Sequence, residues 1–146
     1  MTPADTSPEV DVIDLTVPLA TGDTLHALRR QRQKIVDATQ GSYNAMFAPG
    51  VAGVSVQERL LIALCACRLS GSPALASHYR ERLQREGVAP TLLAAGDGAT
   101  APEDARTAAL LGFTAKLIVK PIEGDQQAVQ ALQAVGLAPQ AVVAVG

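Results

Sequence analysis

Apolar residues recur at helical spacing along most of this chain, and they are densest between Leu60 and Leu69. That stretch is apolar on nearly every face, and a helix of this kind must be enclosed by other elements. Just before it, Ser55 and Glu58 have the S-x-x-E spacing of a capping box, in which each side chain satisfies a backbone N–H group of the other residue. We therefore expect a buried central helix to begin at Ser55.

A second helix is expected directly after the first, within the stretch 54–86. Ser70-Gly71 is a typical helix stop, and Ser72-Pro73 offers a new N-cap with proline at the first helical position. Before Gly87 ends this helix, one of its faces carries an apolar residue at every fourth position: Leu75, Tyr79 and Leu83. The polar residues nearest this corner that could do chemistry are Glu58, Ser72 and His78.

The remaining segments also favour helices, and no stretch shows the alternation of a strand bounded by hairpin turns. Residues 1–9 are rich in proline, threonine and acids, so we expect a flexible tail there. Before the central hairpin, a short helix is expected over 11–17, followed by a longer one from a cap at 21–23 to about 47. The longer helix should be interrupted near 31–33 and kinked or broken at Gly41. After the hairpin, helices are expected over 91–95, from a cap at Thr100 with Pro102 in the first turn to Val119, from Asp125 to Gly136, and over 139–145. The predicted class is all-α.

Length and composition indicate one globular domain over residues 10–146, because the chain has 146 residues of which 48% are hydrophobic. No apolar run approaches the roughly 20 residues that a membrane-spanning helix needs. The N-terminus has no basic segment followed by an apolar one, so it does not resemble a secretory signal, and a cytoplasmic location is expected. The last helix has barely two turns, which predicts an element that is incomplete or is completed by a neighbouring chain.

The charge pattern argues against nucleic acid and anionic membranes as partners. The formal net charge is −2, with acidic and basic residues interspersed. The one basic cluster, residues 29–34, is interpreted as a solvated helix face. Residues 126–145 superficially resemble a helix-turn-helix, but the second helix carries alanine and valine where base recognition needs polar side chains. We expect no DNA binding.

A family resemblance is carried by several segments whose order and spacing agree, over about residues 10–146. They are Ser55-x-x-Glu58-Arg59-Leu60-Leu61-Ile62-Ala63-Leu64, then Gly71, His78 and Tyr79, and downstream Ala105-Arg106-x3-Leu110, Lys116-Leu117, Pro121 and Leu132-x3-Gly136-Leu137. This layout resembles the alkylhydroperoxidase D-like and carboxymuconolactone decarboxylase superfamily, particularly its peroxidase-related branch. The resemblance implies an all-α helical bundle that forms a homo-oligomer. It also implies a further apolar helix after residues 141–145, so the domain is expected to be short at its C-terminus.

The peroxidase members of that superfamily resemble one another in a Glu…Cys-x-x-Cys-x3-His signature, from which this sequence departs. Counted back from His78, the cysteine positions hold Gly71 and Ala74, and a shift of one residue gives Ser72 and Leu75. The two cysteines present, Cys65 and Cys67, lie inside the preceding apolar helix and about 200° apart around its axis, so they cannot bridge each other. They are interpreted as small buried hydrophobes. We expect dithiol peroxidase activity to be lost.

The residues left for chemistry are Glu58, His78, Ser72 and Tyr79. Glu58 and His78 could form a general acid/base pair acting on a small carbonyl or carboxylate substrate. The decarboxylases of the superfamily work without metal or organic cofactor, so the resemblance implies none here. A direct contact between the Glu58 and His78 side chains would need a tilted helix crossing or a bridging water. Glu58 lies about 18 Å of helix before the turn, whereas His78 lies only about 9 Å beyond it.

Other interpretations of the same residues remain open. Glu58 is also explained as the third residue of a capping box, His78 as a hydrogen-bonded structural histidine, and Ser72 as a helix cap. His26 is expected to be exposed to solvent. Two histidines without clustered cysteines or carboxylates do not suggest a metal site. The alternative function is a non-catalytic helical subunit of a homo-oligomer; a weaker alternative is an antioxidant, peroxidase-related oxidoreductase whose thiols come from another chain.

Overall fold

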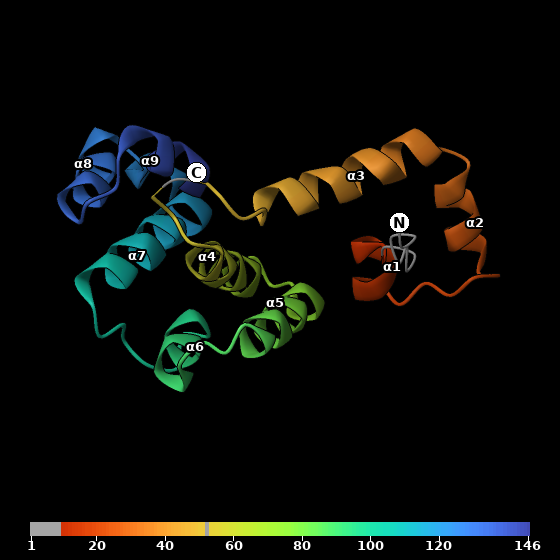
Figure 1. Cartoon of the computed structure of the whole chain (residues 1–146), viewed down its shortest axis with the longest axis horizontal. Helices are drawn as coiled ribbons and strands as arrows, with labels where there is room; N and C mark the ends of the chain where they lie inside the picture. The colour runs from red at the N-terminus through yellow and green to blue at the C-terminus, as the bar shows by residue number, and fades with distance from the viewer. Residues whose placement is uncertain (1–9, 52) are drawn as a thin grey trace, which may run out of the picture. The chain divides into compact units, whose positions relative to one another are not determined.

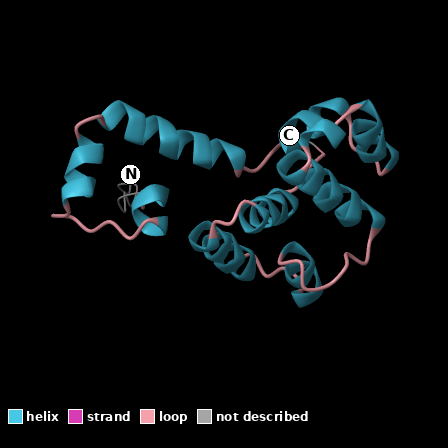
Figure 2. Ribbon diagram, turned by 180° about the vertical axis from the view of Figure 1, so that it is seen from behind, coloured by secondary structure: helices cyan, strands magenta, loops and turns pink. Residues whose placement is uncertain are grey.

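The computed structural model describes residues 10–51 and 53–146, and every regular element in those ranges is a helix (Figure 2). The all-α prediction is thereby confirmed. The tail predicted at residues 1–9 lies outside the described residues. By the density of its contacts the chain divides into an N-terminal unit, residues 1–45, and a C-terminal unit, residues 46–146. The single domain predicted over residues 10–146 stays a prediction.

The N-terminal unit is built from three helices, α1 (Val12–Thr16), α2 (Thr24–Arg30) and most of α3 (Gln33–Met46). The side chain of Asp11 caps α1 by accepting the backbone N–H groups of Ile13 and Asp14. The interruption predicted near residues 31–33 separates α2 from α3 and is confirmed. The break considered at Gly41 is wrong, because α3 continues through that residue, and the kink stays a prediction. One glycine lowers the stability of a helix by only about 1 kcal/mol relative to alanine, so the other residues of α3 can keep the helix continuous.

Ion pairs hold the N-terminal unit together. Arg29 donates to both Asp11 and Asp14, Arg30 donates to Asp14, and His26 Nε2 lies 3.5 Å from the Asp14 carboxylate. The expectation that His26 is exposed is therefore wrong, since its side chain is only 18% exposed beside Asp14. The basic cluster is likewise only partly solvated, because two of its arginines are paired.

The C-terminal unit is organised around α4 (Val56–Leu69), which doubles back into α5 (Pro73–Arg85). Gly71 forms the turn with φ of +72°, a backbone conformation that favours glycine. Helix α4 packs against α5, α7 and α6, and these surround it in Figure 1. Leu60 and Leu64 are completely enclosed. The predicted central helix and its hairpin are confirmed.

The rest of this unit comprises α6 (Pro90–Gly96), α7 (Ala105–Val119), the short 3₁₀ turn η1 (Pro121–Glu123), α8 (Gln126–Ala134) and α9 (Pro139–Val145). Helices α7, α8 and α9 contribute to one apolar cluster around Phe113, Leu132 and Ala141. The predicted start of α7 is wrong: Asp104, rather than Thr100, caps the helix by accepting the N–H of Thr107. The predicted cap at Asp125 is confirmed, because its carboxylate accepts the N–H of Ala128.

Arginines connect the segments of the C-terminal unit. The side chain of Arg59 is buried and donates to the carbonyls of Met46 and Ala48, at 2.6 and 2.8 Å. Arg80 of α5 holds Asp97, at the end of α6, through both carboxylate oxygens.

Within the described ranges no single helix is long and apolar enough to cross a membrane, although α8 and α9, bent by 116°, together reach the length and composition of a broken span.

Candidate functional site

Glu58 lies where the start of α4 meets the start of α7. Its Oε2 accepts the backbone N–H of Ser55 at 2.9 Å, and the Ser55 hydroxyl accepts the N–H of Glu58 at 3.1 Å, which confirms the predicted capping box. Arg106 of α7 donates its Nε to Oε1 at 2.6 Å and its Nη2 to Oε2 at 3.1 Å. The same Nη2 also donates to the carbonyl of Gly53. Both carboxylate oxygens therefore have strong, fixed partners.

These contacts set the charge of Glu58. Burial by itself would raise the pKa of the Glu58 carboxyl, but the hydrogen bonds from Arg106 and the Ser55 N–H outweigh burial and hold this pKa below its ordinary value. The same carboxylate raises the pKa of Arg106. At neutral pH the two groups form a bidentate ion pair, a geometry that fixes the relative position of the two helices.

His78 lies in the middle of α5 in a different environment. It is half-buried, and its ring meets the edge of Tyr79 with ring centroids 5.2 Å apart. Burial, together with the positive charges of Arg82 and Arg85, lowers the pKa of His78, and Glu81 opposes the shift. A lowered pKa keeps the imidazole neutral at pH 7, in the form that can accept a proton.

The structure does not join Glu58 and His78. The interactions of Glu58 run to Ser55 and Arg106, and none runs to His78 in the part of the chain that the structure describes. Among the described residues, the charges that shift the pKa of His78 are Arg82, Arg85 and Glu81 of its own helix. The proposed acid/base pair therefore has no contact to support it, and Glu58 is engaged where the capping-box interpretation places it.

Tyr79 belongs to the core. It is 6% exposed, and its ring lies 5.5 Å from the ring of Phe47, over which the guanidinium of Arg82 sits at 4.8 Å. The predicted apolar stripe of α5 is consistent with this placement, because Leu83 on the same face is also enclosed. Tyr79 therefore has a packing role in the fold.

Ser72 occupies the N-cap position of α5, as the cap interpretation requires, but its hydroxyl makes no capping hydrogen bond there. Its backbone instead closes the turn, where Ser72 N donates to the Cys67 carbonyl at 2.9 Å and the Ser72 carbonyl accepts from Ala76 N at 3.0 Å. The position of the cap is confirmed, and the expected side-chain bond is absent from this described turn.

The thiols are in surroundings that suppress reactivity. Cys65 is 3% exposed and Cys67 is half-buried. Burial raises the pKa of both thiols, and for Cys65 the nearby Arg68 offsets only part of this effect. Because the thiolate is the nucleophile, thiols with raised pKa values are poor candidates for peroxide chemistry.

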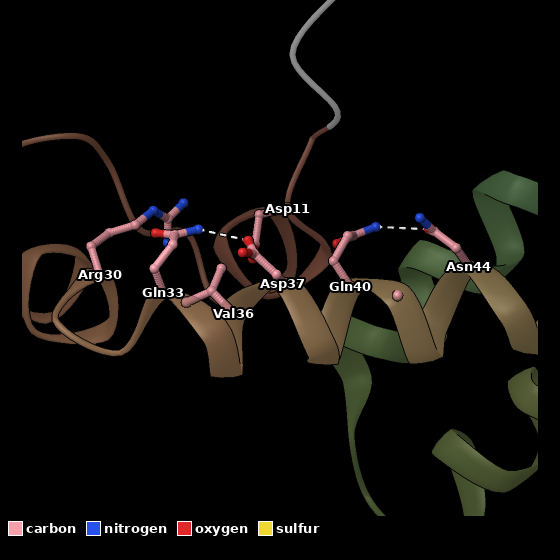
Figure 3. Close-up of a pocket in the computed structure, with 8 residues that line it drawn as sticks. Asp11, Arg30, Gln33, Val36, Asp37, Gln40 and Asn44 are labelled. Carbon is pink, nitrogen blue, oxygen red and sulfur yellow. Dashed lines mark hydrogen bonds between the residues drawn. The ribbon is translucent and has the colours of Figure 1, made fainter.

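Sequence reasoning missed a polar cavity of about 410 Å³ in the N-terminal unit (Figure 3). Gln33 donates to Asp37 at 2.7 Å, and Gln40 both donates to Asn44 at 2.9 Å and accepts the N–H of Val12 at 2.7 Å. The first two bonds join residues four apart along α3, a spacing that the sequence shows, whereas the bond from Val12 spans 28 residues. The remaining wall comes from Asp11, Arg30, Val36 and Gly41. Most of the polar side chains that line the cavity already form hydrogen bonds with one another, which leaves few of them available to bind a ligand.

Neither a cluster of metal ligands nor a similar known protein adds a function to these residues in the described ranges. No group of three or more histidine, cysteine or acidic residues in the described ranges could hold a metal ion. No family model, no curated protein and no solved structure matches the chain. The candidate site is therefore defined by its own geometry: a carboxylate fixed by an arginine, and a neutral histidine on another helix.

Proposed function

We propose that the protein is a carboxymuconolactone decarboxylase-like, alkylhydroperoxidase D-like helical protein without dithiol peroxidase activity, which acts as a non-catalytic subunit of a homo-oligomer. The observation that carries this proposal is the position of Glu58, whose two oxygens are held by Ser55 and Arg106. A carboxylate fixed in this way stabilises the fold, and its lowered pKa makes it a poor proton donor at neutral pH.

The ion pair joins two of the segments on which the family resemblance was drawn. Glu58 and Arg106 belong to two separate segments that carry the resemblance, 48 residues apart in the sequence, and the fold brings them together. Assembly is supported by apolar side chains left at the surface of the C-terminal unit, where Ile122 is 92% and Val143 81% exposed.

Two measurements on the wild type test this proposal. Sedimentation velocity should give a mass of at least twice the 15.1 kDa of one chain. Hydroperoxide consumption with a dithiol reductant should not exceed the rate without protein, and Cys65→Ser and Cys67→Ser should leave that result unchanged. A monomer at all concentrations, or turnover that either cysteine variant abolishes, would contradict the proposal.

A second candidate function is cofactor-free proton transfer on a small carbonyl or carboxylate substrate. The observation that favours it is the neutral, half-buried imidazole of His78. In this case His78 acts as the base, and Glu58 serves only to hold α4 and α7. The test is deuterium incorporation from heavy water into a panel of small keto acids and lactone carboxylates. His78→Gln should abolish it, while Gln84→Ala, an exposed change on the same helix, should leave it intact; incorporation that persists in His78→Gln would exclude this function.

A further inference from the structure

The polar cavity of the N-terminal unit contains one buried donor that the protein itself does not satisfy. Arg30 donates its Nη2 to Asp14, but its other terminal nitrogen, Nη1, is buried without a hydrogen-bond partner in the part of the chain that the structure describes. A buried N–H group without an acceptor costs free energy, and the cost is larger when the group is charged. Because Arg30 belongs to the cavity wall, an acceptor bound in the cavity would satisfy this donor.

The same wall holds a carboxylate oxygen that no neighbour engages. Gln33 donates to Oδ1 of Asp37 at 2.7 Å, whereas no hydrogen bond from the described residues reaches its Oδ2. Asp11, the other acid of the wall, is already engaged, because it caps α1 and accepts from Arg29. Asp37 therefore remains able to bind a cation, and Figure 3 shows it between Gln33 and Gln40 along α3.

These two groups together select a ligand that carries both signs of charge. A divalent anion would be attracted by Arg30 but repelled by Asp37, and a simple cation would meet the reverse problem. An α-amino acid satisfies both groups, because it has a carboxylate and an ammonium group. The cavity volume of about 410 Å³ falls within the range of small-molecule sites, about 300–1,000 Å³.

The rest of the wall favours a polar side chain on that amino acid. Gln40 and Asn44 line the cavity with amide groups, and Val36 is the apolar side chain among the described residues of the wall. Amide groups both donate and accept hydrogen bonds, so a ligand with an amide side chain matches this part of the cavity.

We propose that this cavity binds a polar α-amino acid, with its carboxylate on Arg30 Nη1, its ammonium group on Asp37 and its side chain beside Gln40 and Asn44. The inference does not rest on the proposed function. The cavity lies in the N-terminal unit, and neither Glu58 nor His78 lines it.

The main test is an NMR titration of the full-length protein with L-glutamine. Saturable shifts are expected at the backbone amides of Arg30, Gln33 and Asp37, and none at Leu64 in the C-terminal core. N-acetyl-L-glutamine lacks the ammonium group and L-glutaminamide lacks the carboxylate, so each should bind about tenfold or more weakly than L-glutamine. No saturable shift up to about 10 mM L-glutamine would overturn the proposal.

The analogues also separate an amino-acid site from a simple anion site. If N-acetyl-L-glutamine binds as tightly as L-glutamine, or if inorganic phosphate binds more tightly, Asp37 is not recognising an ammonium group. Either result would overturn the proposal.

A cavity-filling variant tests the location without weakening the helix. Gly41 lies within α3 and lines the cavity, and a Cβ added there would meet nothing within 4 Å. Leucine favours helix more than glycine does, so Gly41→Leu should fold and should raise the dissociation constant by about tenfold or more. Ser42→Leu, an exposed change about 100° around the helix from Gly41, is the control and should bind like the wild type. Unchanged binding in Gly41→Leu would overturn the proposal.

Asp37→Asn tests the ammonium contact separately. Asp37 is exposed, so this change should leave the fold intact and weaken L-glutamine binding by about three- to tenfold. Binding of N-acetyl-L-glutamine, which has no ammonium group, should be unchanged. A merely structural role of Asp37 would weaken both ligands equally, and that result would overturn the proposal.

Discussion

The two units of this protein are stabilised in different ways. In the C-terminal unit the largest enclosed side chains are leucines, with Leu60, Leu64, Leu83 and Leu132 fully buried. In the described part of the N-terminal unit the buried apolar side chains are Val12 and Val36, and its helices are connected by ion pairs from α2 to α1 and by the hydrogen bond from the Val12 N–H to Gln40. The C-terminal unit therefore has an ordinary apolar core, whereas the N-terminal unit has polar contacts between its helices and several apolar side chains exposed at its surface.

This difference indicates where each unit obtains its stability. A fully buried leucine contributes about 1.5–3 kcal/mol, whereas a partly exposed ion pair contributes about 0–1 kcal/mol. The C-terminal unit can therefore form its own core, while the N-terminal unit gains more when its exposed leucines are covered.

The largest effect is expected in the C-terminal core. Leu64→Ala removes an enclosed side chain of α4 and should lower the free energy of unfolding by about 2–5 kcal/mol, measured by urea denaturation. The matched change in the N-terminal unit, Leu28→Ala, should cost less than about 0.5 kcal/mol at dilutions where the chain is monomeric, because that side chain is exposed. Equal losses in the two variants would remove the contrast between the units.

A smaller loss is expected for Arg59→Met. This change leaves the carbonyls of Met46 and Ala48 without the guanidinium that they accept from, so the free energy of unfolding should fall by roughly 1.5–3 kcal/mol. Arg85→Met, an exposed change on α5, is the control and should be nearly neutral. The measurement is again urea denaturation, and a stable Arg59→Met variant would show that these hydrogen bonds are dispensable.

Acid should weaken the junction of α4 and α7. The folded-state pKa of Glu58 lies below its ordinary value of 4.5, so its contribution to stability is fully present above that value and is lost as pH falls through the folded-state pKa. Glu58→Gln should cost about 1 kcal/mol at pH 7, as for loss of a helix cap, and should flatten the stability profile below pH 4.5. Glu86→Gln, an exposed change, should keep the wild-type profile.

The smallest effect concerns salt. Raising sodium chloride to about 1 M screens surface charges, so amide hydrogen exchange should accelerate in α1 and α2, by an amount equivalent to roughly 0.2–1 kcal/mol per ion pair. Exchange at Leu64, enclosed in the apolar core, should be unaffected by this screening. Equal salt responses in both units would contradict the view that ion pairs supply a larger share of the stability in the N-terminal unit than in the C-terminal one.

Sequence reasoning succeeded where the signal was local. The capping box of Ser55 and Glu58 is fixed by a spacing of three residues, and the Gly71 turn by one residue. It was wrong at the start of α7, where Thr100, Pro102 and Asp104 compete within five positions. All three residues favour a helix start, so the local pattern does not distinguish among them.

Partners distant in sequence could not be predicted. Arg106 is 48 residues from Glu58 and Arg59 is 13 from Met46, and each pairing depends on how the helices pack. The burial of His26 has the same cause, because it depends on Asp14 of another helix. A single sequence shows which residues are charged, but it does not show which charge each one meets.

The central claim is that Glu58 is a structural residue bound to Arg106 and is not coupled to His78. It is tested most directly by NMR titration of the His78 imidazole in the wild type and in Glu58→Gln. We predict that the pKa of His78 is below its ordinary value of 6.5 in both proteins and is unchanged by the substitution. A fall of one unit or more in Glu58→Gln, equivalent to about 1.4 kcal/mol, would show an acid/base pair and contradict the claim.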